Sequence, residues 1–113
     1  DSSIQLADIN KKFYRILKQF APFGPENMRP VFLAKNVQLK GTPRIVGNNH
    51  LKVSFYQSEN PELFFDAIGF NLGEKMELLR TENPVDIVFC IEENEWNGKV
   101  SLQLNLKDLK ASE

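Results

Sequence analysis

The first part of the chain has the hydrophobic spacing of an amphipathic helix. Between residues 6 and 20, apolar side chains recur every three or four positions, at Leu6, Ile9, Phe13, Ile16, Leu17 and Phe20. This spacing places them on one helical face. Basic residues lie off that face, at Lys11, Lys12, Arg15 and Lys18. We expect Asp8 to cap the helix, because its carboxylate can accept from the free amides of the first turn. Pro22 should end it, since the residue before a proline avoids the helical conformation.

Residues 22–30 contain three prolines and a glycine, which predicts a rigid, extended connector. The pattern then changes. Short runs rich in Val, Ile, Leu and Phe, separated by Gly, Asn and Pro, predict an antiparallel sheet. The runs cover residues 31–40, 50–57, 63–71, 85–93 and 99–107. Residues 73–80 are mostly good helix formers and too polar for a strand, so a short helix is expected there.

The Asn97-Gly98 pair predicts a two-residue type I′ hairpin, because both residue types tolerate positive φ. If Trp96 pairs with Lys99, then Ile91 lies opposite Leu104, and the apolar residues of both strands share one side. In the same register Phe89 lies opposite Leu106. The other side then carries Trp96, Asn94 and Glu92 from one strand and Lys99, Ser101, Gln103, Asn105 and Lys107 from the other.

The run 50–57 alternates in the same way. Leu51, Val53 and Phe55 are expected to face the core. The intervening residues should face solvent: His50, Lys52, Ser54 and Tyr56.

The predicted order β-β-β-α-β-β is that of the OB-fold, a five-stranded, partly open barrel that commonly binds oligonucleotides or oligosaccharides. Other small barrels share this order, and a fold does not fix a function. We therefore predict a mainly β chain. Residues 1–30 form a linker helix and a Pro-rich connector, and residues 31–113 form an OB-fold domain, together as one compact unit.

Composition narrows the classes of function. The 113 residues include 42% hydrophobic and 26% charged side chains, as in ordinary globular domains. The formal charge of −1 provides no global field that attracts nucleic acid, so any such binding must come from a local patch. No run approaches the ~20 apolar residues of a membrane span, and we expect no membrane partner.

A single cysteine, Cys90, cannot form an internal disulfide and suits a reducing compartment, so we expect a cytoplasmic protein. The chain begins at Asp1 without a methionine, and we expect it to be a piece of a longer protein. We also expect it to be a monomer.

Binding of single-stranded nucleic acid requires cations for phosphates and flat side chains for stacking. Candidates are Arg44, His50, Lys52, Tyr56, Trp96, Lys99 and Lys107. The alternative is that the lysines merely solvate half-buried strands and that Tyr56 or Trp96 packs on the N-terminal helix. Both interpretations remain open at this stage.

Enzymatic chemistry has less support. His50 is the only histidine and has no partner at metal-ligand spacing. Carboxylates near the hairpin, at Glu92, Glu93 and Glu95 with Asp66, could hold a divalent cation or simply solvate the hairpin. Cys90 has no local activator, so inert packing is the better interpretation. We predict no catalytic residue and no metal site in this chain.

Four segments together resemble the C-terminal part of the RecJ family of single-strand-specific DNA exonucleases. They are LKQFAPFGPENMRPVF (17–32), VGNNHLKVSF (46–55), FDAIGFNLG (65–73) and IEENEWNGKVSLQLNLKDL (91–109). The resemblance implies the OB-fold domain that follows the catalytic DHH domains and helps to hold the single strand. His50 and Lys52 match the family's strand, and Trp96, Asn97 and Gly98 match its hairpin. Met28 stands where that pattern more often has a proline.

In that family the nuclease uses aspartate and histidine clusters that coordinate manganese or magnesium in the earlier domains. Those motifs are absent from this chain. The resemblance therefore implies a part that binds DNA without cutting it, within a 5′–3′ exonuclease of DNA repair and recombination. The N-terminal helix would be the last part of the linker that joins the nuclease core to the barrel.

Two hypotheses follow. In the first, the chain is an accessory module for single-stranded DNA, with phosphate contacts from Arg44, Lys52, Lys99 and Lys107 and stacking on Tyr56 or Trp96. In the second, it is a scaffold that packs on its own nuclease domains without touching DNA, an idea supported by the apolar stripe of the N-terminal helix.

Overall fold

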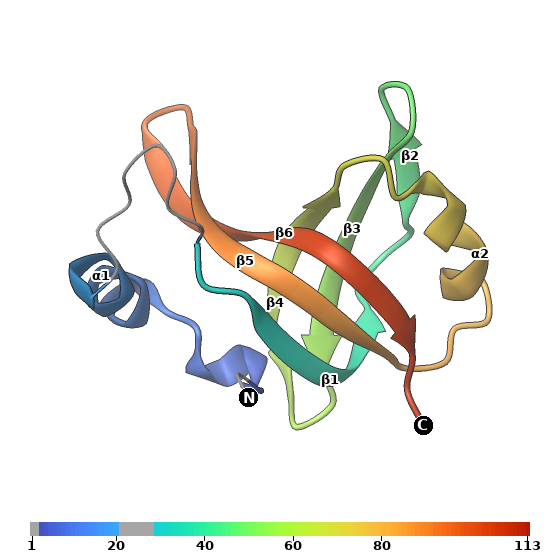
Figure 1. The fold of residues 1–113 in the computed structure, drawn as a ribbon, viewed down its shortest axis with the longest axis horizontal. Coiled ribbons are helices and arrows are strands. Elements are labelled where there is room, and N and C mark those ends of the chain that lie inside the picture. The colour runs from blue at the N-terminus through green and yellow to red at the C-terminus, as the bar shows by residue number, and fades with distance from the viewer. Residues whose placement is uncertain (1–2, 21–28) are drawn as a thin grey trace.

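Six strands dominate the computed structural model, which describes residues 3–20 and 29–113 (Figure 1). The strands are β1 (Phe32–Leu39), β2 (Arg44–Val46), β3 (His50–Gln57), β4 (Asn60–Gly69), β5 (Val85–Trp96) and β6 (Lys99–Ala111). The helical segments are η1 (Leu6–Asp8), α1 (Lys11–Phe20), η2 (Gly73–Lys75) and α2 (Met76–Leu79). None of the helices in this part of the chain has both the length and the apolar character of a membrane-spanning segment.

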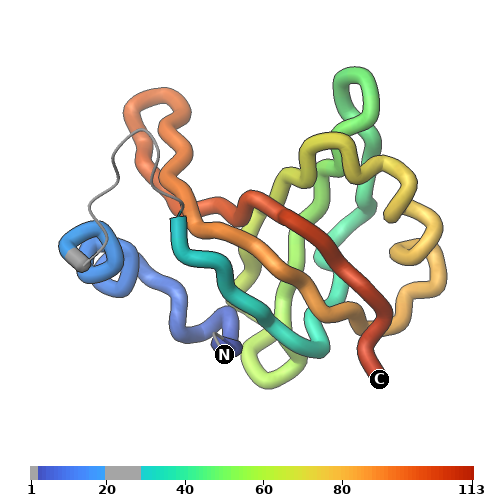
Figure 2. The backbone as a smooth tube through the Cα atoms, in the orientation of Figure 1, coloured from blue at the N-terminus to red at the C-terminus, as the bar shows by residue number. Residues whose placement is uncertain are grey.

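Strand pairing closes five of these strands into a ring. β1 pairs with both β5 and β3, β3 pairs with β4, β4 with β6, and β6 with β5. All of these pairs are antiparallel except β4–β6, which is parallel. The tube in Figure 2 shows the strands curving around a common interior. The mainly β class is confirmed, and the predicted β-β-β-α-β-β order is confirmed for the five strands of the ring.

The strand β2 was not predicted. It has three residues and pairs only with β3, where Arg44 lies opposite Lys52 and Val46 opposite His50. Such a short segment carries too few positions to show a hydrophobic period. The predicted strand at 85–93 continues to Trp96, because polar residues also pair along the projecting part of the hairpin, and the predicted strand at 99–107 continues to Ala111, because residues 108–111 pair with the start of β5.

The predicted hairpin register is confirmed. Asn97 and Gly98 have φ of 53° and 79°, and Trp96 lies opposite Lys99. Ile91 pairs with Leu104 and Phe89 with Leu106. The register then shifts, because Val88 pairs with Asp108, so Lys107 is the extra residue of a β-bulge.

The core lies inside the ring. Leu51, Val53 and Phe55 are buried as predicted, while the intervening residues of β3 are half-buried on the outside. Phe89 is fully buried and lies in the aromatic series Phe13–Phe32–Phe89, with centroids 5.8 and 6.2 Å apart.

The single N-terminal helix predicted for residues 6–20 is wrong, because the chain breaks between η1 and α1. Leu6 and Ile9 are drawn into the core, with 1% and 3% of their surfaces exposed. Asp8 does not cap the long helix, and its carboxylate accepts instead from the amide of Gln5 at 3.0 Å. The cap of α1 is Asn10, whose Oδ1 accepts from the amide of Phe13 at 2.8 Å.

Helix α1, which is described as far as Phe20, lies beside the β5–β6 hairpin (Figure 1). Its predicted end before Pro22 lies outside the described residues. Phe13 and Leu17 pack against the core, whereas Ile16 on the predicted stripe is 40% exposed. Pro22, Met28 and most of the predicted connector fall in residues 21–28, outside the described residues.

Candidate nucleic-acid interface

The outward faces of β3 and β4 bring several of the predicted residues onto one surface. Lys52 pairs with Ile68, Ser54 with Asp66, and Tyr56 with Phe64. Because opposed residues of an antiparallel pair point to the same side, these six side chains form one continuous patch. Strand β2 extends the patch by placing Arg44 opposite Lys52. We call this surface the β3–β4 face.

A shallow cationic hollow of about 190 Å³ lies where the β3–β4 face meets β2 and the loop between β1 and β2. Its lining includes Lys40, Arg44 and Lys52 together with a single carboxylate, Asp66. Asp66 Oδ1 accepts from Ser54 Oγ at 2.6 Å. Within the described residues none of the three cations forms an ion pair, so the hollow keeps an excess of positive charge that suits a phosphate group.

Exposed aromatic rings lie on both sides of this hollow. Phe70 is 52% exposed and contacts His50 edge-on, with ring centroids 5.2 Å apart. At the other end Phe64 is 45% exposed, and Lys40 Nζ lies 5.4 Å from its ring centroid. Along β3 the two ends are separated by six residue steps, or about 20 Å at ~3.3 Å per residue. The β3–β4 face therefore combines phosphate-binding charge with surfaces for base stacking.

Sequence reasoning missed Lys40, Phe64 and Phe70. A signal was present, because Phe64 and Phe65 are adjacent in a strand and must point to opposite faces. Phe65 packs against the core, so Phe64 must face outward.

His50 and Tyr56 have structural contacts within this face. The amide of Asn71 donates to His50 Nδ1 at 3.2 Å, so the neutral ring carries its proton on Nε2. Tyr56 donates its hydroxyl hydrogen to Gln38 Oε1 at 3.4 Å. Both rings are half-buried, so only part of each ring is open to a ligand.

The other three predicted residues lie elsewhere. Trp96 and Lys99 face each other at the tip of the β5–β6 hairpin, where Trp96 is 74% exposed. The N-terminal helix therefore does not bury Trp96. Lys107 lies in the bulge near Cys90, a thiol whose pKa is raised by burial and lowered in part by the charge of Lys107. The structure thus groups Arg44, His50, Lys52 and Tyr56 but separates them from the hairpin tip and from Lys107.

The hairpin carboxylates do not converge. Glu92 pairs with Arg29 at 3.0 Å and accepts from the Gln103 side chain at 2.7 Å. Glu93 points to the opposite face, where its Oε1 lies 3.9 Å from Lys18 Nζ. Among residues 3–20 and 29–113, no group of three His, Cys, Asp or Glu side chains is placed to share a metal ion.

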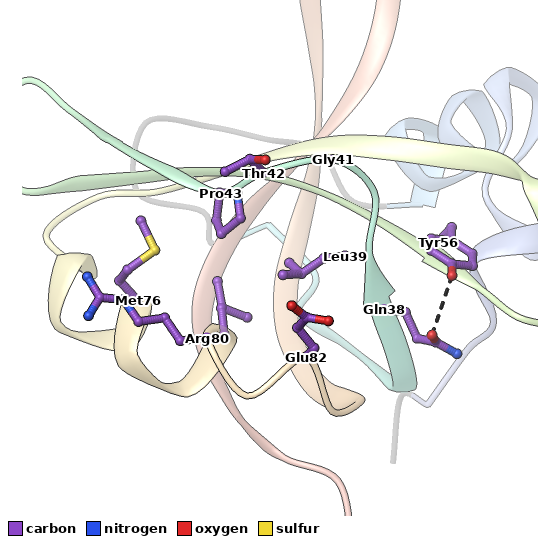
Figure 3. Close-up of a pocket in the computed structure, with 10 residues that line it drawn as sticks. Gln38, Leu39, Gly41, Thr42, Pro43, Tyr56, Met76, Arg80 and Glu82 are labelled. Carbon is purple, nitrogen blue, oxygen red and sulfur yellow. Dashed lines mark hydrogen bonds between the residues drawn. The ribbon is translucent and has the colours of Figure 1, made fainter.

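A larger hollow of about 640 Å³ lies between α2, the end of β1 and the loop that follows it (Figure 3). Leu39, Pro43 and Met76 give it an apolar part, while Arg80 and Glu82 add opposite charges. Because these charges balance, the hollow does not select for an anion.

A five-stranded ring with a helix between β4 and β5, closed by the parallel β4–β6 pair, defines this chain as an OB-fold domain. The chain belongs to the RecJ OB domain family, whose model matches residues 1–108. This confirms the resemblance found in the four sequence segments.

Relatives agree with this assignment. The chain is 33% identical over 107 residues to the single-stranded-DNA-specific exonuclease RecJ of Bacillus subtilis (strain 168), covering 94% of this chain and 13% of that protein. The chain therefore spans a small part of the length of this relative.

Solved structures share the fold. RecJ from Thermus thermophilus in complex with Mn²⁺ matches with a TM-score of 0.67 and 21% identity, over 99% of this chain and 15% of that one. The complex of the same protein with Mg²⁺ matches with a TM-score of 0.60 and 23% identity, over 88% of this chain and 14% of that one. The mitochondrial single-stranded DNA binding protein Rim1 of S. cerevisiae matches with a TM-score of 0.52 and 16% identity, over 74% of this chain and 96% of that one.

Proposed function

We propose that this chain is an accessory module that binds single-stranded DNA within a RecJ-like 5′–3′ exonuclease of DNA repair and recombination. The observation that carries the proposal is the β3–β4 face, where Lys40, Arg44 and Lys52 surround a hollow between the exposed rings of Phe64 and Phe70. Phosphates would enter the hollow and bases would stack on the rings, the combination on which non-specific single-strand binding depends.

We assign DNA cleavage to other domains of the longer protein. The described residues form no acidic or histidine cluster for a divalent metal, and Asp66 is held by Ser54. The RecJ of Thermus thermophilus has been solved with Mn²⁺ and with Mg²⁺. We infer that such an ion serves nuclease domains outside this chain, while the OB domain positions the strand.

A scaffold role is the second candidate, supported by the hollow of about 640 Å³ beside α2. Its apolar lining would accept a side chain from the nuclease core or from another protein. The apolar stripe that first supported this role is largely used internally, because Phe13 and Leu17 pack against the chain's own core.

The two roles are separated by fluorescence anisotropy of a labelled oligonucleotide titrated with the 113-residue chain. The triple variant Lys40→Gln, Arg44→Gln, Lys52→Gln should bind more weakly. If each cation meets one phosphate, the slope of log K against log salt should fall by about 2, at ~0.7 per phosphate for a single strand. Phe64→Ala and Phe70→Ala should each cost about 1–3 kcal/mol of binding.

The matched control is Lys35→Gln, Arg80→Gln, Lys110→Gln, which removes the same charge from exposed positions that do not line the hollow at Lys40, Arg44 and Lys52. It should leave the salt slope unchanged. If both triple variants lost the same affinity for the oligonucleotide, binding would depend on the net charge of the chain and not on the β3–β4 face. No binding by the unaltered chain at low salt would favour the scaffold role.

A further inference from the structure

Helix α1 carries positive charge out of proportion to the rest of the molecule. Its ten residues, KKFYRILKQF, contain four cations and no carboxylate. Since the whole chain has a formal charge of −1 and α1 contributes +4, the other residues together carry −5. A concentration of positive charge therefore lies on a helix outside the strand ring, on a chain that is otherwise acidic.

Helix stability does not explain this arrangement. Lys11 and Lys12 occupy the first turn, where the helix dipole is positive and where acidic residues are favoured. Only Lys18, in the last turn, lies where a cation stabilises the helix. Residues that go against the local preferences of a helix, without stabilising the structure in another way, are typical of a functional surface.

The packing of α1 leaves these cations available. Phe13 and Leu17 turn toward the core. Lys11, Arg15 and Lys18 lie on another side, at i, i+4 and i+7, and line a hollow of about 190 Å³ with Tyr14. Within the described residues Lys11, Lys12 and Arg15 form no ion pair.

Among the residues that the structure describes, one carboxylate reaches this hollow. Glu93 Oε1 lies 3.9 Å from Lys18 Nζ, and both side chains are about half exposed, so the pair contributes little. Lys18 Nζ also lies 5.5 Å from the Tyr14 ring centroid. The hollow thus presents three cations, one weakly paired carboxylate and an aromatic residue, a combination that fits a phosphate and its attached nucleoside.

The cationic surface of α1 lies apart from the β3–β4 face. Glu93, which contacts α1, points to the side opposite Glu92 and Trp96 because successive strand residues alternate. Figure 1 shows α1 beside the hairpin at one side of the molecule, β3 and β4 in the middle, and β2 toward the other side. Trp96 is exposed at the tip of this hairpin.

We propose that the cationic face of α1, formed by Lys11, Lys12, Arg15 and Lys18, is a second phosphate-binding surface for single-stranded DNA. A strand that leaves the β3–β4 face and passes the hairpin tip at Trp96 is held again by α1. This inference rests on the proposed function, and it adds a contact that only a longer strand reaches.

The test compares two labelled oligonucleotides, one of about 6 and one of about 16 nucleotides, within the range of OB-fold site sizes. The variant Lys11→Gln, Lys12→Gln, Arg15→Gln keeps the Lys18–Glu93 pair and should not weaken α1, which circular dichroism checks. It should bind the short oligonucleotide like the unaltered chain. Its affinity for the long one should fall at least tenfold at low salt, with a salt slope smaller by about 2 for three phosphates.

The control variant Lys35→Gln, Arg80→Gln, Lys110→Gln removes the same charge elsewhere and should show neither effect. The inference is overturned if both variants bind the long oligonucleotide equally; the α1 surface would then suit an acidic protein partner. Loss of affinity for both lengths in the α1 variant also overturns it. If the unaltered chain binds neither length, the proposed function fails together with this inference.

Discussion

Asp86 is the one buried charged side chain of the core region, with 9% of its surface exposed, among the residues that the structure describes. Its Oδ1 accepts two hydrogen bonds, from the amide of Asn36 at 3.0 Å and from Ser112 Oγ at 2.6 Å. Asn36 has a φ of 57° and lies where the β1–β5 register shifts between Ala34 and Val37. The carboxylate therefore joins the bulge of β1 to the end of the chain.

Replacing Asp86 by Ala should lower the free energy of unfolding by about 1–3 kcal/mol, because two donors lose their acceptor in a buried position. Urea denaturation measures this loss. Asp86→Asn is the matched control, since it keeps an acceptor oxygen of the same shape, and it should lose less. Equal losses in the two variants would show that the hydrogen bonds to Oδ1 are not what stabilises this region.

Among the elements, α1 shows how local sequence and tertiary contacts compete. Asp8 and Asn10 are both good capping residues. The burial of Leu6 and Ile9 requires an extended residue at Ile9, with φ −92° and ψ 117°, and this ends η1. The helix then restarts with Asn10 as its cap.

Asn10→Ala should therefore destabilise the chain by about 1 kcal/mol and reduce helical signal, because the first turn of α1 loses its side-chain acceptor. Far-ultraviolet circular dichroism during thermal unfolding provides the measurement. Asp8→Ala removes only the exposed bond to Gln5 and should have a smaller effect. If Asp8→Ala were the more damaging change, the helix would begin earlier than described.

At the scale of the whole molecule, the N-terminal segment belongs to the barrel. Ser3 forms a parallel bridge with Leu33, and the amide of Ile4 donates to the carbonyl of Leu33 at 2.8 Å. Leu6 is buried and its amide donates to Gln57 Oε1 at 2.8 Å. Residues far apart in the chain thus share one core.

Leu6→Ala should cost about 2–5 kcal/mol of unfolding free energy, as expected for a large-to-small change in a packed core. Ile16→Ala is the control, because Ile16 has the same hydrophobic character in sequence but is 40% exposed, and it should cost much less. Guanidinium denaturation compares the two. Similar losses would indicate that α1 packs more tightly than described, or that Leu6 packs less tightly.

The sequence alone determined the elements whose signals are local. Alternation with a period of two marked β3, and Asn97-Gly98 defined both the turn and the register of the β5–β6 hairpin. The family resemblance rested on ordered segments of the same kind. These features depend on neighbours within a few residues, so they can be inferred without knowing how the ring closes.

Only the tertiary structure decided which outward residues share a surface. Phe64 and Lys40 join Lys52 because β4 and the end of β1 lie beside β3, and Trp96 is set apart because the hairpin projects from the ring. It also decided that Leu6 leaves the helix for the core. Pairing between distant strands and burial in a common interior bring together residues far apart in sequence, and no local period along the chain records those contacts.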